Sequence, residues 1–192
     1  MNSARLSVGV QGLSVGERAY QQAVAYATER RQGRAVGAPP GTDSPIVDHP
    51  DVRRMLLTMR AQIEALRCLA YLNAESLDIA ARHPDPAVAT ARQELADLLT
   101  PITKGWGTDL GVELTSLAVQ VHGGMGYIEE TGVAQHYRDA RIAPIYEGTN
   151  GIQALDMVGR KLPMRGGGVM ADYLASIEAT AAELSGAPEP DL

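Results

Sequence analysis

The stretch "LSVGVQGLSVGERAYQQAVAYATERR", residues 6–31, decides the fold class of this chain. Its apolar residues recur at steps of three, four or seven, at Leu6, Val10, Leu13, Tyr20, Val24 and Ala27. That spacing places them on one face of a helix, because an α-helix turns once every 3.6 residues. We therefore predict a long helix that extends to about Arg31 and buries one face.

Two more apolar rows of the same kind follow. The second consists of Val52, Leu56, Met59, Ile63, Leu66, Ala70 and Leu77 and stops before the prolines of "HPDP", residues 83–86. The third consists of Leu95, Leu98, Ile102, Trp106, Leu110, Leu114, Leu117 and Val121, with Pro101 inside it, where we expect a bend. Each helix would be roughly 40 to 50 Å long at 1.5 Å per residue, which favours a bundle.

Shorter elements complete the predicted fold. Glycines in residues 121–132 end the third helix, and a short helix is predicted in each of residues 133–142 and 149–162. We predict an all-α protein, an antiparallel four-helix bundle with additional short helices. Residues 1–162 form the bundle domain, and residues 163–192 form an extension that is helical to about Leu184 and then disordered. The glycines and prolines of residues 33–45 predict a long loop.

Composition excludes several classes of function. The 192 residues contain no Phe and carry a formal net charge of -6, which gives no footprint for nucleic acid or an anionic membrane. No apolar run approaches the ~20 residues of a membrane span. Cys68 is the only cysteine, so no internal disulfide forms, and we interpret it as a small core residue. We expect a cytoplasmic protein without a metal site.

Two local motifs carry chemistry, and each has an ordinary interpretation as well. In "IYEGTNGIQ", residues 145–153, Glu147 precedes a helix capped by Thr149. Glu147 is either a partner of the helix dipole or a catalytic base. In "QVHGGMGY", residues 120–127, the glycines either end a helix or bring backbone amides close to a phosphate.

The combination of these motifs resembles the C-terminal helical domain of the acyl-CoA dehydrogenases. The resemblance covers roughly residues 3–162 and rests on "ARLSVGVQGLSVGERAYQQAVAYATERRQGR", "QVHGGMGYIEE", "YRDARI" and "IYEGTNGIQ". The stretch "PIVDHPDVRRMLLTMRA", residues 45–61, resembles the longer-chain branch that includes 3-methylmercaptopropionyl-CoA dehydrogenase-like enzymes. The family motifs thus select the catalytic interpretation of Glu147.

The resemblance implies an FAD-dependent oxidation of an acyl-CoA thioester to a trans-2-enoyl-CoA, with Glu147 as the base that removes the α-proton. Arg5 and Gly148 are implied on the substrate side. The residues implied in FAD binding are Arg30, Gln32, Gln120, Gly123 and Gly124, toward the flavin of a neighbouring subunit, and Thr149 and Gly151, near the flavin diphosphate. The implied partners are an acyl-CoA, an electron-transfer flavoprotein as electron acceptor, and further copies of the chain in a dimer or tetramer.

Two readings of the function stay open on the sequence. The first is the C-terminal domain of a dehydrogenase that needs the family's preceding helical domain and β-domain, so that the isolated chain is inactive. The second is a non-catalytic helical module that mediates oligomerisation. An oxidase on the same fold is a third possibility, and the acyl group is left open.

Overall fold

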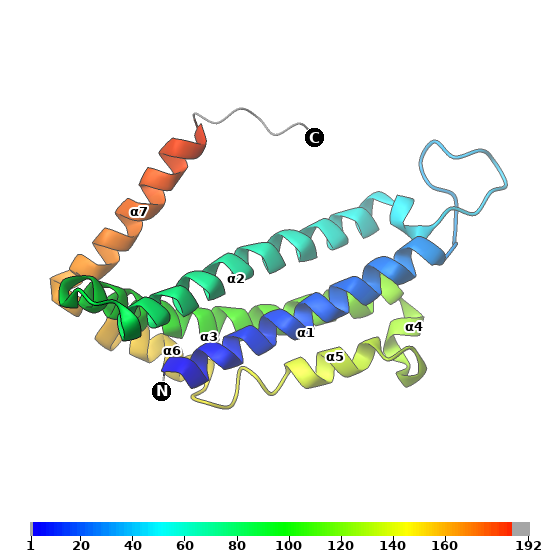
Figure 1. Cartoon of the computed structure of the whole chain (residues 1–192). Helices are drawn as coiled ribbons and strands as arrows, with labels where there is room; N and C mark the ends of the chain where they lie inside the picture. The colour runs from blue at the N-terminus through cyan, green and yellow to red at the C-terminus, as the bar shows by residue number, and fades with distance from the viewer. Residues whose placement is uncertain (1, 186–192) are drawn as a thin grey trace.

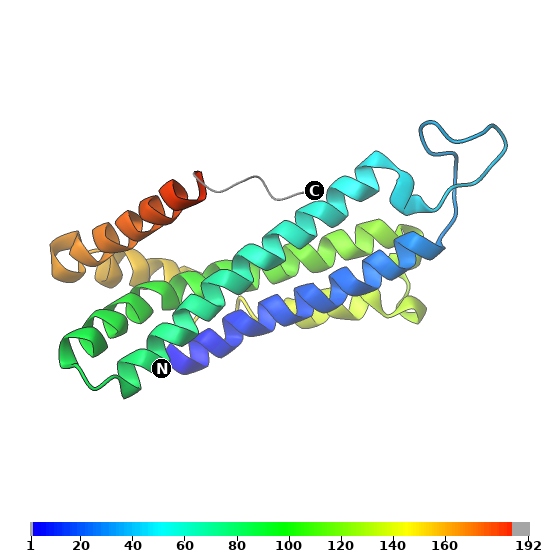
Figure 2. The ribbon, with the colours of Figure 1, turned by 45° about the horizontal axis from the view of Figure 1, so that its top comes forward.

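Residues 2–185 are described by the computed structural model, and three long helices dominate this part of the chain (Figures 1 and 2). They are α1 (Asn2–Glu29), α2 (Pro50–Arg82) and α3 (Pro86–His122). Each forms where an apolar row predicts it. Consecutive long helices run in opposite directions, so α1 and α3 are parallel to each other. The predicted all-α bundle is confirmed.

The third helix begins earlier than its apolar row. Asp85 caps it by accepting a hydrogen bond from the backbone N–H of Ala87 at 2.8 Å, and Pro86 occupies the first turn. Both residue types favour a helix start. The row begins only at Leu95 because the first turns of α3 face solvent or lie half-buried.

The fourth position of the bundle is filled by a short helix. After α4 (Gly124–Tyr127) and a 3₁₀ turn, η2 (Glu129–Thr131), α5 (Val133–Ala140) returns along α1 and α3. The Gln22 side chain of α1 donates from Nε2 to the Thr131 carbonyl at 2.7 Å. Its Oε1 accepts a hydrogen bond from His136 Nε2 at 3.0 Å. α5 lies within the short helix predicted over residues 133–142, and it covers only part of the bundle's length (Figure 1).

The remaining elements follow in order. They are η1 (Ile46–Asp48) between α1 and α2, α6 (Asn150–Asp156), the π-helix η3 (Met157–Lys161), η4 (Met164–Gly167) and α7 (Gly168–Ser185). The helix predicted over residues 149–162 thus changes from α to π halfway. α7 contacts α3 near its start, where Val169 is buried, and then leads away from the bundle (Figure 1). The disorder predicted for the tail lies outside the described residues.

The long predicted loop between α1 and α2 is present and is closed at its base. The backbone N–H of Gln32 donates to the Ser44 carbonyl at 3.1 Å, and that of Ser44 donates to the Gly33 carbonyl at 2.8 Å. The segment between them protrudes beyond the end of the bundle (Figure 1). The loop is long but its ends are fixed to each other.

The interpretation of Cys68 as a core residue is wrong, because its side chain is exposed. Leu66 and Ala70 occupy the buried face of α2. Cys68 lies two residues from each, about 200° around the helix, and so faces solvent.

Among residues 2–185, no helix is long and apolar enough to cross a membrane.

The tightest packing in the bundle is between α1 and α3, and glycines make it possible. A Cβ atom built on Gly12 would lie 2.2 Å from the carbonyl oxygen of Gly107, and one on Gly9 would lie 2.6 Å from that of Thr103. A Cβ on Gly111 would lie 2.8 Å from the carbonyl oxygen of Gly12. The two backbones therefore touch directly, and no other residue type fits at these positions. We call Gly9, Gly12, Gly107 and Gly111 the glycine seam.

Replacing Gly111 by Ala should destabilise the chain, whereas Gly105→Ala, six residues earlier in α3, should not. The new Cβ at 111 would push α1 away, and overpacking typically costs about 1–3 kcal/mol. The Cβ at 105 would make an ordinary 3.6 Å contact with Gln153. Ala also favours a helix over Gly by up to about 1 kcal/mol. Thermal melts check this, and a Gly111→Ala protein that melts as high as Gly105→Ala would contradict the seam.

Candidate active site

Glu147 lies in a tight turn whose backbone is strained. Its φ of 53° is in the left-handed region, which non-glycine residues rarely adopt, and Gly148 follows with a φ of 84°. The backbone N–H of Asn150 donates to the Pro144 carbonyl at 3.0 Å and closes the turn around Glu147. Strain of this kind costs about 1–2 kcal/mol at a non-glycine residue. Such strain is concentrated at functional sites, so it supports a functional role for Glu147.

The turn leads directly into α6, as the sequence predicts. Thr149 is the N-cap, and its hydroxyl accepts a hydrogen bond from the backbone N–H of Ile152 at 3.3 Å. Gly151 lies in the first turn of α6 and is exposed. The Gln153 side chain is buried and donates from Nε2 to the Gly148 carbonyl at 3.1 Å. The φ of 84° at Gly148 favours glycine, and a Cβ there would also lie 2.8 Å from that nitrogen.

A buried polar group lies beneath the turn. Lys104 of α3 is completely buried and donates to the Asn150 side-chain oxygen at 2.9 Å. The Asn150 amide nitrogen donates in turn to the Gly105 carbonyl at 3.0 Å and to the Asp109 carboxylate at 2.7 Å. Burial lowers the pKa of Lys104, and the negative charge of Asp109 opposes that effect. Lys104 is not among the site residues predicted from the sequence, because a single lysine between Ile102 and Trp106 gives no signal of burial.

Arg5 joins the turn from the first helix. Its guanidinium pairs with Asp156 of α6 at 2.8 Å, and both side chains are largely buried. Burial alone would raise the pKa of Asp156, but hydrogen bonds from Arg160 and Arg5 outweigh it and lower that pKa. A Cβ built on Gly148 would lie 3.8 Å from Arg5 Nη2. The structure thus brings Arg5 close to Gly148, the neighbour of Glu147, although Arg5 and Glu147 are 142 positions apart in the sequence.

The Glu147 residue itself is exposed in this chain. A carboxylate is a stronger base in a pocket that excludes water, and residues 2–185 enclose no such pocket around Glu147.

The predicted flavin-contacting residues form a second group. Arg30, Gln32, Gly123 and Gly124 line one cleft of about 290 Å³, together with Tyr26, Ile46, Val121, His122 and Met125. Gly123 is also the C-cap of α3, and its N–H donates to the Gln120 carbonyl at 3.0 Å. Gln120 is exposed in the last turn of α3 and is not among the lining residues. Gly123 therefore ends a helix, as one interpretation predicts, and a contact of its amide with a phosphate stays a prediction.

His122 forms one wall of this cleft. It is buried, its ring stacks on Tyr26 with the centroids 4.2 Å apart, and its Nδ1 bonds the Ala118 carbonyl at 2.8 Å. Burial lowers the pKa of His122. The hydrogen bond to Ala118 raises that pKa, and the charge of His136 lowers it further, so the net shift is downward. Through its stack on Tyr26, His122 therefore packs the ends of α1 and α3 against each other.

The two groups lie far apart in one chain. Arg5 and Arg30 are 25 positions apart along α1 and its end. At 1.5 Å per residue this is about 37 Å. The Glu147 group and the Arg30 group are therefore at opposite ends of the bundle.

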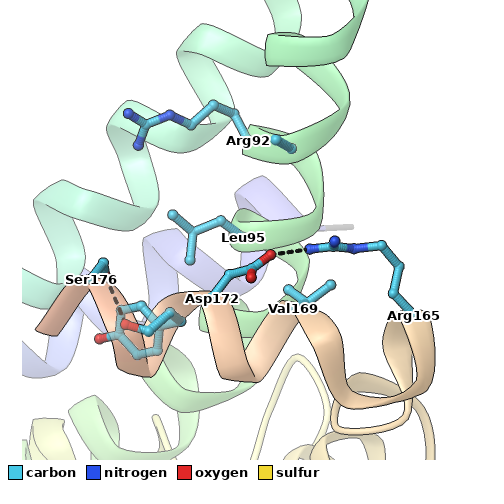
Figure 3. A pocket seen from close by; sticks show the side chains of 8 residues that line it. Arg92, Leu95, Arg165, Val169, Asp172 and Ser176 are labelled. Atoms are coloured by element: carbon cyan, nitrogen blue, oxygen red, sulfur yellow. Dashed lines mark hydrogen bonds and ion pairs between the residues drawn. The ribbon is translucent and has the colours of Figure 1, made fainter. Parts of the chain in front are cut away.

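Another cleft lies between α3 and α7, and it contains residues of neither the Glu147 group nor the Arg30 group. It is lined by residues that include Arg92, Leu95, Arg165, Val169, Asp172 and Ser176 (Figure 3). Arg165 pairs with Asp172 at 2.6 Å and with Glu94 of α3 at 2.9 Å. Arg165 thus connects α7 to α3 through two ion pairs. We interpret the cleft as a space between the two packed helices.

The motifs and the geometry agree with what is known of related proteins. A family model described as the acyl-CoA dehydrogenase C-terminal domain matches residues 1–162. The 3-methylmercaptopropionyl-CoA dehydrogenase of Ruegeria pomeroyi is 54% identical over 185 residues, which are 96% of this chain and 31% of that protein. The subunit CarC of the caffeyl-CoA reductase-Etf complex of Acetobacterium woodii is 31% identical over 163 residues, which are 84% of this chain and 37% of that protein.

Solved structures show the same relationship. The butyryl-CoA dehydrogenase of Megasphaera elsdenii superimposes with a TM-score of 0.66 at 32% identity, over 84% of this chain and 36% of that one. The chain belongs to the acyl-CoA dehydrogenase family and is a C-terminal domain of it, which confirms the family predicted from the motifs. It spans about a third of the length of the curated relatives that it matches.

Replacing Glu147 by Gly should stabilise the chain. Glycine removes a left-handed penalty of about 1–2 kcal/mol, offset by its extra unfolded-state entropy of about 0.5–1 kcal/mol. A helix-dipole role predicts the opposite, a loss of about 0.3–1 kcal/mol. Urea unfolding measures the difference, with Glu113→Gly on the exposed face of α3 as the control, which should lose about 1 kcal/mol. A loss at both positions would show that Glu147 is not strained.

Acidification should destabilise the chain partly through His122. Because the folded-state pKa of His122 is lowered, the unfolded chain binds the proton more readily, and the free energy of unfolding falls as the pH drops below about 6.5. His122→Phe keeps an aromatic ring against Tyr26 and removes the proton. Its stability should therefore fall less than that of the wild type between about pH 7 and about pH 5. Equal pH slopes in urea unfolding would exclude this role for His122.

Proposed function

We propose that the chain is the C-terminal domain of an FAD-dependent acyl-CoA dehydrogenase that converts an acyl-CoA to a trans-2-enoyl-CoA. The observation that carries the proposal is the left-handed backbone of Glu147 on a turn fixed to the buried group of Lys104 and Asn150. A carboxylate that only balanced a helix dipole would not need a strained position. In this proposal Glu147 removes the proton from the α-carbon of the substrate.

The environment that Glu147 requires follows from its chemistry. A carboxylate becomes a stronger base when water is excluded from it. Because Glu147 is exposed here, the proposed reaction needs further residues to cover it, and we expect the 192-residue chain to be inactive by itself. The backbone N–H of Glu147 would donate to the thioester oxygen, where negative charge develops as the proton leaves.

The residues of the cleft at Arg30 and Gly123 fit a flavin adenine dinucleotide. Arg30 supplies a cation for a diphosphate, Gln32 supplies an amide, and nothing lies within 4 Å of a Cβ built on Gly123 or Gly124, so a ligand can reach the backbone there. We propose that these residues and Gln120 contact the FAD of a neighbouring subunit, and that Thr149 and Gly151, at the other end of the bundle, contact a different FAD near its diphosphate. The bound FAD would accept the hydride from the β-carbon.

The separation of the two groups supports an oligomer. With about 37 Å between Arg5 and Arg30, a chain would contribute its two groups to two different flavins. We propose a homo-oligomer, a dimer or tetramer, in which Arg30 and its neighbours contact the flavin of another subunit. Closed symmetric assemblies satisfy such an arrangement.

The substrate and the electron acceptor are proposed by class. Arg5 lies beside Gly148 and would act on the substrate side, near the thioester and CoA. The name of the Acetobacterium woodii relative places it in a complex with Etf. We propose an electron-transfer flavoprotein as the acceptor of electrons from this enzyme as well. The alternative, a non-catalytic oligomerisation module, gives no reason for the strained Glu147.

In the full-length enzyme that contains this chain, Glu147→Gln should keep acyl-CoA binding and lose flavin reduction by about 10²–10⁴-fold, because the amide cannot accept the proton. Stopped-flow absorbance under saturating acyl-CoA measures the rate. The matched control is Glu113→Gln, an exposed carboxylate of α3 outside both groups, which should reduce its flavin at the wild-type rate. Reduction within about threefold of wild type in Glu147→Gln, a barrier change below ~1 kcal/mol, would assign the base to another residue.

A further inference from the structure

Lys104 is a completely buried lysine that the mechanism above does not use. An ammonium group carries three N–H donors, and within residues 2–185 its hydrogen-bond partner is the Asn150 side-chain oxygen at 2.9 Å. Burying a cation is costly, and apolar residues of similar size are often at least as stable in such positions. Stability alone therefore does not account for a lysine here.

The contacts of Asn150 show what Lys104 holds. Asn150 is the first residue of α6, and its side chain contacts Lys104, Gly105, Thr108 and Asp109 across 41 to 46 positions of sequence. Its backbone N–H closes the Glu147 turn by donating to Pro144. A displacement of Asn150 therefore displaces Glu147, three residues before it.

A second contact acts on the same turn from the other side. Gln153 is 1% exposed and donates from Nε2 to the Gly148 carbonyl. Its Oε1 has no hydrogen-bond partner among the described residues. The Gln153 side chain therefore holds Gly148 through Nε2 while its Oε1 stays without a hydrogen bond. The turn is thus held at two places, Asn150 and Gly148.

We propose that Lys104 is a positioning residue, which acts through Asn150 to hold Glu147 in its left-handed conformation. This inference rests on the proposed function only in its kinetic consequence; the structural consequence stands without it. Lys104 fixes the side chain of Asn150, and the backbone N–H of Asn150 closes the turn. The strained backbone at Glu147 persists because the turn is held at Asn150 and at Gly148. Without the ammonium group, the turn should relax toward an ordinary backbone conformation.

The test uses the full-length enzyme with Lys104→Met, Asn150→Ala and the double variant. Hydrogen exchange by mass spectrometry follows the peptide over residues 144–153, and steady-state kinetics with an acyl-CoA gives kcat and KM. Each single variant should exchange at least about 10-fold faster in this peptide and lose about 10–100-fold in kcat, with KM changed by less than about threefold. The double variant should be no worse than the more severe single variant, because both changes break one connection.

The control is Thr115→Val, a buried residue of α3 whose hydroxyl bonds the carbonyl of Gly111 in its own helix. It should leave the exchange of residues 144–153 and kcat unchanged. If Lys104→Met does not fold, Asn150→Ala carries the test, since it breaks the same connection without leaving a cavity around a long side chain.

The outcomes separate this proposal from the proposed function. Unchanged exchange in Lys104→Met, or effects on kcat that multiply in the double variant, would overturn positioning and indicate a charge acting directly on the substrate. Faster exchange, combined with normal flavin reduction in Glu147→Gln, would support positioning of the turn and refute Glu147 as the base.

Discussion

The direct contact between the backbones of α1 and α3 determines the rest of the structure. At the glycine seam the two helices approach until a single added Cβ atom would collide with the carbonyl oxygen of Gly107 or Gly12. Contact this close fixes both the distance between the helices and their relative position along the axis. The seam therefore sets where each residue of α1 lies against α3.

Both groups of candidate site residues depend on that alignment. α1 brings Arg5 to the Glu147 turn and Arg30 to the cleft at Gly123, and α3 contributes Lys104 to the first group and His122 to the second. A shift of one turn between the helices, about 5.4 Å, would separate the members of both groups at once. The glycine seam thus aligns both groups of candidate residues, although no seam residue belongs to either group.

Three unfavourable features meet at the Glu147 turn. They are the left-handed backbone of Glu147, the buried ammonium group of Lys104 and, among residues 2–185, the unpartnered Oε1 of Gln153. A left-handed Arg165 and unpartnered amide oxygens of Gln62 and Asn73 occur elsewhere, so the Glu147 turn differs in bringing all three kinds of feature together. Natural proteins tolerate such local conflicts where function requires them.

The sequence by itself determined the helices and the family. Apolar spacing located α1, α2 and α3 because burial on a helix repeats every 3.6 residues, and the motifs around Gly123 and Glu147 identified the acyl-CoA dehydrogenase family. Local capping at Thr149 was also readable, since an N-cap bonds only its own first turn. The roles carried over for Glu147, Arg30 and the other site residues stay predictions.

Only the tertiary structure decided what depends on residues distant in sequence. Periodicity could not show that Lys104 is completely buried and bonded to Asn150, 46 positions away. It also could not show that Arg5 lies beside Gly148 while Arg30 lies about 37 Å away. These facts follow from how the helices pack, because burial and hydrogen bonding at each position are set by the partner helix, and the sequence of one helix does not contain its neighbour's position.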